Sequence, residues 1–175
     1  GVAPLVPGAN RHLTGAAAAL PFFAIGLYAV WLRLRRGPTV DAPALLKALR
    51  SASPEDMRAM LAEAYARERF EVGDGAGGDL ELQRNGYVTL VRFRRWRAQS
   101  TGPTAVQELQ AAMRARQADH GVYITAGAVT ESARQRAGQS DVTLVDGIAL
   151  AELVGRTRGA RAALQRAAAA EAAKA

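Results

Sequence analysis

The strongest hydrophobic pattern in the chain is an uncharged run at residues 13–32. An α-helix of this length spans about 30 Å, which is the thickness of the hydrocarbon core of a bilayer. Tyr28 and Trp31 lie near the end of the run, and amphipathic aromatic rings prefer the membrane interface. The pattern predicts one transmembrane helix, preceded by a short segment at residues 1–12.

The arginines beside this run predict its orientation. One arginine precedes the run, and three follow it directly, namely Arg33, Arg35 and Arg36. Positive residues favour the cytoplasmic side of a membrane. We therefore expect a single-pass protein of a bacterial inner membrane, with residues 1–12 outside the cytoplasm and all residues after the run inside it.

Small residues and a proline within the run indicate a neighbouring membrane helix. Gly15 and Ala19 have the spacing that lets two helices approach closely. Pro21 frees a backbone carbonyl that an adjacent helix can satisfy. We therefore expect an integral membrane protein or complex as the partner of this segment.

A juxtamembrane linker at residues 33–53 follows, with a short apolar helix expected at residues 44–50. Ser53 before Pro54 is a good helix start, because serine caps the first turn and proline fits its first position. This helix should end near Arg69. Apolar residues at helical spacing should face a core, and they are Met57, Met60, Leu61, Ala64 and Tyr65.

Strand and helix patterns then alternate up to the end of the predicted domain at residues 54–155. The expected strands are residues 70–72, 79–83, 87–96, 121–125 and 142–145. Asn85-Gly86 predicts a tight hairpin turn. Helices should begin at Gly102-Pro103, at Thr130 and at Asp146-Gly147. The order α-β-β-β-α-β-α-β-α indicates an α/β fold with a mixed sheet flanked by helices.

The composition removes several classes of chemistry. The chain has no cysteine, which excludes disulfides, thiolate zinc sites and cysteine nucleophiles, and its two histidines, His12 and His120, are far apart. The net charge of +7 comes from the ends, because residues 1–36 and residues 156–175 each carry +4 whereas residues 37–155 carry −1. The domain thus lacks the positive surplus typical of DNA-binding domains. The alanine-rich basic tail is helical by propensity but shows no apolar stripe.

Four local sequences occur in the order and at the spacing found in one nuclease family. They are Asp74-Gly75-Ala76-Gly77-Gly78-Asp79-Leu80, Arg92-Phe93-Arg94-Arg95-Trp96, Gly121-Val122-Tyr123-Ile124-Thr125 and Val145-Asp146-Gly147. On these motifs the chain, from Pro54 to Val154, resembles the Mrr-like branch of the restriction-endonuclease fold. The resemblance implies a restriction-endonuclease-like mixed sheet flanked by helices.

The resemblance also implies a site, in which an aspartate and a second acidic or amide residue hold Mg²⁺ and a lysine positions water. Asp79 matches the aspartate, but Arg92 stands at the second ligand position and Arg94 at the lysine position. At about 4 Å and an effective dielectric constant of about 20, a unit charge repels a divalent ion by about 8 kcal/mol. We interpret the three residues as a structural ion pair on adjacent strands; a metal site rebuilt with Glu63 or Glu81 is the alternative.

A second candidate is a basic strand with interleaved aromatic residues, which suits nucleic acid. Its cations are Arg92, Arg94, Arg95 and Arg97, and its aromatic residues are Phe93 and Trp96. Strand alternation would place the two rings on opposite faces. The competing interpretation is that Trp96 packs under a helix and that the outer arginines are solvated.

Two functions remain. The first is a membrane-anchored, catalytically degenerate nuclease-like domain that acts as a binding or accessory subunit of a membrane complex, without metal or cofactor, and with DNA not the favoured ligand. The alternative is a membrane-tethered Mrr-type DNA-binding protein or endonuclease that uses Mg²⁺. In the alternative, Asp79 and Glu63 would hold the metal, and phosphates would meet Arg92, Arg94, Arg95 and Arg97.

Overall fold

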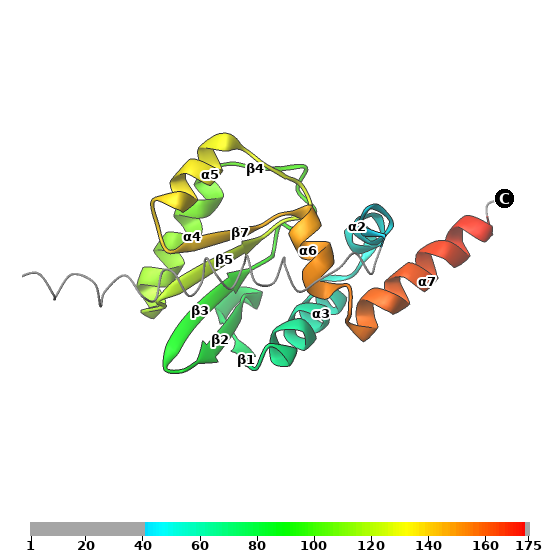
Figure 1. Cartoon of the computed structure of the whole chain (residues 1–175). Coiled ribbons are helices and arrows are strands. Elements are labelled where there is room, and N and C mark those ends of the chain that lie inside the picture. The colour runs from blue at the N-terminus through cyan, green and yellow to red at the C-terminus, as the bar shows by residue number, and fades with distance from the viewer. Residues whose placement is uncertain (1–40, 174–175) are drawn as a thin grey trace, which may run out of the picture. The chain divides into compact units, whose positions relative to one another are not determined.

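The structure, a computed structural model, describes residues 41–173. In chain order its elements are α2 (Ala42–Ser51), α3 (Pro54–Arg67), β1 (Glu71–Asp74), the 3-10 turn η1 (Ala76–Gly78), β2 (Leu80–Arg84), β3 (Tyr87–Arg92), β4 (Ser100–Thr101), α4 (Pro103–Arg116), β5 (His120–Ile124), β6 (Ala128–Val129), α5 (Glu131–Gly138), β7 (Val142–Val145), α6 (Gly147–Val154) and α7 (Arg158–Ala172) (Figure 1). The predicted membrane helix at residues 13–32 lies outside the described residues. Among the helices from α2 to α7, none is long and apolar enough to cross a membrane.

The sheet has five strands in the order β1-β2-β3-β5-β7. The first three strands are antiparallel neighbours, whereas β5 pairs parallel with β3 and β7 pairs parallel with β5. This confirms the predicted mixed sheet; the order of the strands within it was not predicted. Two further strands, β4 and β6, form a separate parallel pair of two residues each. Strands this short carry too little alternation to be predicted from periodicity.

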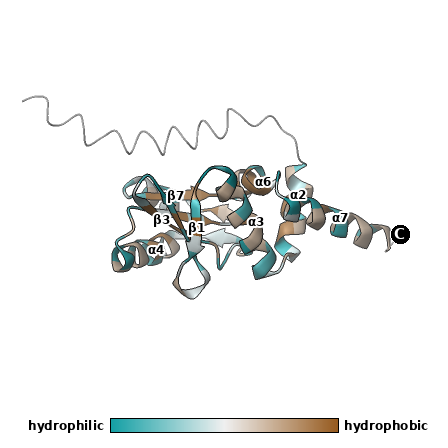
Figure 2. Ribbon diagram, turned by 90° about the horizontal axis from the view of Figure 1, so that it is seen from below, coloured by the Kyte–Doolittle hydropathy of each residue, from teal (hydrophilic) through white to brown (hydrophobic). Residues whose placement is uncertain are grey.

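Helices cover both faces of the sheet. Leu80 and Leu82 pack with α2, α3, α6 and α7 in one core cluster. Leu90, Tyr123 and Val142 point the other way and pack with α4 and α5. Figure 2 shows the hydrophobic strands around β7 between helices that also carry hydrophilic residues. Helices therefore cover the sheet on both sides, as expected where parallel strands are connected by helices.

The helix starts follow from local capping. Ser53 accepts a hydrogen bond from Asp56 N at 3.0 Å, and Thr130 accepts one from Ala133 N at 3.3 Å. Each side chain satisfies an N–H group that has no partner within its helix. Both predicted starts are confirmed, as are all five core residues predicted for α3.

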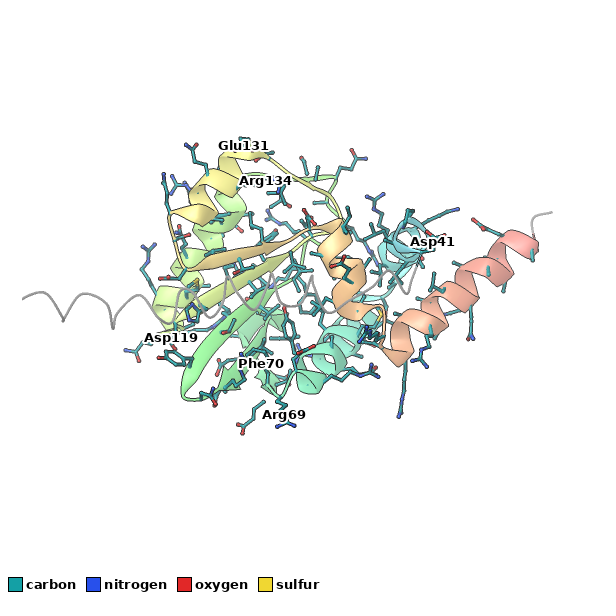
Figure 3. The ribbon with its side chains drawn as sticks, viewed as in Figure 1. Asp41, Arg69, Phe70, Asp119, Glu131 and Arg134 are labelled. Atoms are coloured by element: carbon teal, nitrogen blue, oxygen red, sulfur yellow. The ribbon has the colours of Figure 1, made fainter. Side chains whose placement is uncertain are left out.

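Two turns at the edge of the sheet use left-handed backbone. Asn85 and Gly86 have φ values of 53° and 81°, which confirms the predicted hairpin turn. Arg69 has φ 63° between α3 and β1, where it lies beside Phe70 (Figure 3). The Phe70 ring meets Tyr65 edge-on at a centroid distance of 5.9 Å. This contact fixes the path of the chain from α3 into the first strand.

The strand predicted at residues 87–96 ends earlier, at Arg92, and this prediction was wrong beyond that residue. The chain turns instead, because Trp96 N donates to Phe93 O at 3.0 Å. Phe93 and Trp96 therefore lie in the same core cluster and not on opposite faces. The Trp96 indole donates to Leu49 O of α2 at 3.2 Å. The interpretation that Trp96 packs under a helix is confirmed.

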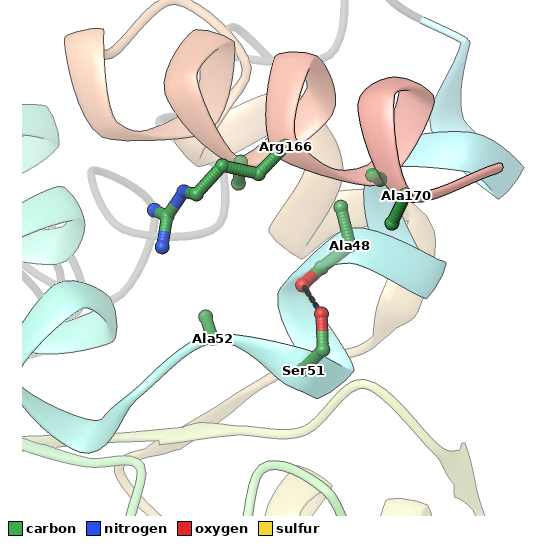
Figure 4. A pocket seen from close by; sticks show the side chains of 7 residues that line it. Ala48, Ser51, Ala52, Arg166 and Ala170 are labelled. Atoms are coloured by element: carbon green, nitrogen blue, oxygen red, sulfur yellow. Dashed lines mark hydrogen bonds between the residues drawn. The ribbon is translucent and has the colours of Figure 1, made fainter. Parts of the chain in front are cut away.

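The tail predicted without an apolar stripe has one. In α7, Ala160 and Ala163 are buried and Leu164 packs against the same cluster. Such small side chains bury little area each, but they let helices approach closely. Figure 4 shows α7 beside α2, with a shallow space between them lined mainly by alanine, together with Ser51 and Arg166. The tail is therefore part of the folded domain as far as the described residues reach.

Candidate functional site

Asp79 lies immediately before β2, and its side chain is fully buried. Because Leu80 pairs with Val91, Asp79 lies across from Arg92 at the end of β3. Leu80 points toward α3, and side chains alternate along a strand. Asp79 and Arg92 thus point to the face that α4 covers. A carboxylate buried there needs opposite charge and hydrogen bonds.

The Arg92 guanidinium lies against both carboxylate oxygens of Asp79. Its Nη2 donates to Oδ2 at 3.0 Å, and its Nε lies 3.3 Å from Oδ2 and 3.4 Å from Oδ1. Opposite charge makes such contacts stronger than hydrogen bonds of the same length between neutral groups. Asp79 and Arg92 thus form an ion pair at the adjoining ends of β2 and β3, and its structural role stays a prediction.

Two more arginines reach the same carboxylate. Arg94 Nε lies 3.3 Å from Asp79 Oδ1, and Arg116 Nη1 lies 3.5 Å from Oδ2. Both arginines also donate from Nη2 to the carbonyl of Ala76, at 3.2 Å and 2.9 Å. Arg116 was not among the predicted site residues. The sequence feature that could have indicated Arg116 is its position three residues after the buried Met113. This spacing places both residues on one side of α4.

The glycine-rich turn before β2 positions Asp79 and the arginines around it. Gly77 has φ 73°, and a Cβ atom there would overlap the Arg94 guanidinium. Only glycine combines this backbone conformation with that contact. Arg58 of α3 donates to the Asp79 carbonyl at 3.4 Å and pairs with Asp74. The turn thus holds Asp79 and its arginines from the backbone side.

Tyr123 is a further neighbour, which was named in a family motif but not among the predicted site residues. It is buried on β5, directly beside Arg92 in the parallel register. Burial raises the pKa of Tyr123 above the ordinary value of 10.0, and Glu108 and Asp79 act in the same direction, while Arg95 and Arg92 oppose them. The ring therefore stays neutral at physiological pH and closes the site on the β5 side.

The remaining predicted cations do not converge on Asp79. Arg97 donates to the Ala52 carbonyl and lies over the Trp96 ring at 4.7 Å from its centroid. Arg95 is exposed in the turn after β3. The four arginines therefore divide into a pair that contacts Asp79, half-buried Arg92 with exposed Arg94, and an outer pair with structural or solvent contacts.

The two alternative acids are engaged elsewhere. Glu63 accepts from Arg67 Nη2 at 2.6 Å and from the backbone N–H of Arg158 at 3.0 Å, so it caps the start of α7. Glu81 accepts from Gln83 Nε2 at 3.2 Å. Neither carboxylate is among the described contacts of Asp79.

These residues do not fit a magnesium ion. Mg²⁺ requires near-octahedral oxygen ligands, whereas the site offers one carboxylate that already contacts three guanidinium groups. Each guanidinium would repel a divalent ion by about 8 kcal/mol at 4 Å and an effective dielectric constant of about 20. Within residues 41–173, no group of three or more histidine, cysteine, aspartate or glutamate residues has a metal-binding arrangement.

The chain resembles a family of known proteins and, more distantly, a solved structure. No curated protein gave a significant match. A solved structure that resembles the chain is the MspJI restriction endonuclease in complex with a 27-mer oligonucleotide, at 19% sequence identity and a TM-score of 0.39. That match covers 95% of this chain and 39% of MspJI, so the chain spans well under half of that protein's length. The Mrr_cat family of restriction endonucleases matches residues 49–154, more than half of the chain, and the chain therefore belongs to this family.

Proposed function

We propose that this restriction-endonuclease domain does not cut DNA and acts as a binding or accessory subunit of a membrane complex. The observation that carries the proposal is the buried Asp79 with Arg92, Arg94 and Arg116 around its carboxylate. A nuclease of this kind needs that carboxylate to bind a metal ion. Here the guanidinium groups of the three arginines contact the oxygen atoms of this carboxylate.

The chemistry of the second position supports the same proposal. Arg94 stands where the family has a lysine, and it is fastened to Asp79 and to the Ala76 carbonyl. A guanidinium is planar, bulky and permanently charged, so it does not replace a lysine ammonium that positions water. Two of the three residues required for metal-dependent cleavage are thus unsuited to it.

A plasmid-cleavage assay tests the loss of activity. The full chain is incubated with supercoiled plasmid and either Mg²⁺ or Mn²⁺, with an active restriction endonuclease as positive control. We expect the plasmid to stay supercoiled. Nicking or linearisation that disappears in Asp79→Asn would favour the alternative function, an Mrr-type endonuclease.

The membrane part of the proposal rests on the sequence alone, since residues 13–32 and the arginines after them lie outside the described residues. Protease added to spheroplasts should leave the domain intact if it lies in the cytoplasm. Replacement of Gly15 and Ala19 by leucine should reduce the amount of partner that co-purifies in mild detergent. Digestion of the domain from outside would overturn the proposed topology.

A further inference from the structure

We propose that the three guanidinium groups of Arg92, Arg94 and Arg116 form a metal-independent binding site for a phosphate dianion. Such a dianion is carried by inorganic phosphate and by the terminal phosphate of a nucleic acid. The inference rests on the proposed function, because it requires that no metal ion occupies the position beside Asp79.

The first argument is the balance of charge. Three arginines contact one carboxylate, which leaves a surplus of two positive charges around Asp79. Arg58, which donates to the Asp79 carbonyl, does not add to the surplus because it pairs with Asp74. Clustered cations repel one another in a partly buried site, and the single Asp79 carboxylate offsets one of the three charges. A doubly charged anion matches the surplus, whereas one phosphodiester group carries a single charge.

The second argument is the number of unused donors. Arg92 donates from Nε and Nη2, and Arg94 donates to a carbonyl from Nη2, while neither uses its Nη1 within residues 41–173. Arg116 Nη1 is buried and has no hydrogen bond in the described part of the chain. Arg92 and Arg94 therefore each keep an N–H group for an incoming oxygen, whereas Arg116, whose Nη1 is buried 3.5 Å from Asp79 Oδ2, contributes its charge. A phosphate has several acceptor oxygens, and guanidinium forks match them.

The third argument is access and rigidity. The side chains of Arg92 and Arg116 are 15% and 23% exposed, whereas that of Arg94 is 48% exposed. The buried end of the site thus lies at Asp79, and its solvent-exposed end lies at Arg94. Contacts with Asp79 and with the Ala76 carbonyl hold the guanidinium groups in place before a ligand arrives. Such preorganisation lowers the entropy cost of binding.

Isothermal titration of the full chain with inorganic phosphate, in buffer containing EDTA, tests the site. We expect saturable binding that Arg94→Gln and Arg116→Gln each weaken about tenfold or more, because each removes a positive charge from the site and Arg94→Gln also removes a charge-assisted hydrogen bond. Arg136→Gln is the matched control, since Arg136 is an exposed arginine on α5, and it should bind phosphate like the parent chain. Circular dichroism confirms that each variant is folded.

Oligonucleotides identify the source of the phosphate. A 5′-phosphorylated duplex that binds more tightly than the same duplex without the phosphate supports the site and assigns it to nucleic acid ends. Binding of inorganic phosphate with no difference between the two duplexes supports the site and assigns it to a small ligand. Absence of arginine-dependent binding in both arms overturns the inference but leaves standing the proposed loss of cleavage, which metal-dependent plasmid cleavage would overturn.

Discussion

The surroundings of Asp79 and the outer edge of the domain along α7 both contain ion pairs, but they differ in exposure to solvent. Asp79 is fully buried, and its arginines are held by the sheet, α4 and the turn before β2. Along α7, Lys47 pairs with Glu171, and both side chains are largely exposed. Water screens the second kind of pair much more than the first. Similar contacts therefore have different effects on stability and on ligand binding.

Removal of the buried carboxylate should have the largest effect. Asp79→Ala leaves three guanidinium groups facing one another without an anion, and loss of one partner of a buried pair costs about 3 kcal/mol. We expect the urea midpoint of unfolding to fall accordingly. If phosphate binds this site, added phosphate should restore part of the loss. An unchanged midpoint would show that the arginines do not depend on Asp79.

Overpacking of α7 should have the next largest effect. Ala160 is fully buried, and extra methylene groups in a packed core cost about 1–3 kcal/mol. Ala160→Leu should therefore lower the free energy of unfolding by about 2 kcal/mol. Ala169→Leu is the matched control, because Ala169 is exposed on the same helix. Equal stability of the two variants would mean that α7 does not pack on the domain.

Tyr123 should give a smaller effect that depends on pH. Its folded pKa lies above the ordinary value of 10.0, because burial disfavours the phenolate. The folded state then keeps the proton more firmly than the unfolded state, so stability is constant below pH 10 and falls as pH rises through the folded pKa. Relative to Tyr123→Phe, we expect the free energy of unfolding of the parent chain to fall by up to about 1.4 kcal/mol per pH unit in that range. Parallel stability curves above pH 10 would contradict this account of Tyr123.

The smallest effect is expected at the exposed pair along α7. Lys47→Gln removes the contact with Glu171, where both side chains stay largely in water. Exposed ion pairs contribute about 0–1 kcal/mol, so the midpoint temperature of unfolding should change little. The difference between variant and parent chain should shrink further in high salt. A loss of stability as large as that of Asp79→Ala would show that exposed and buried ion pairs do not differ in this protein.

Much of the fold could be predicted because its signals are local. Ser53, Thr130 and the Asn85-Gly86 turn act through neighbouring backbone groups, so a few residues of sequence contain the whole cause. The strand predicted to reach Trp96 was wrong because the burial of this ring under α2 overrides the alternating pattern. The stripe of α7 was missed because alanine adds little hydrophobicity and its role is to allow close packing.

The site was predictable only in part for the same reason. The pair of Asp79 and Arg92 follows from strand register, and the family motifs pointed to both residues. Arg116 comes from a helix far along the chain, and its approach to Asp79 depends on how α4 packs on the sheet. Tyr123 likewise requires the parallel pairing of β5 with β3. Contacts of this kind become visible only once the elements are assembled.

The central claim is that arginines stand where a metal ion would bind, and electron paramagnetic resonance of Mn²⁺ tests it most directly. The full chain is mixed with an equal concentration of Mn²⁺, and the signal of the free hydrated ion is recorded for the parent chain and for Asp79→Asn. Our account predicts the same full signal of free Mn²⁺ in both samples, since Arg92, Arg94 and Arg116 already occupy the carboxylate. A signal reduced by the parent chain and restored by Asp79→Asn would contradict it.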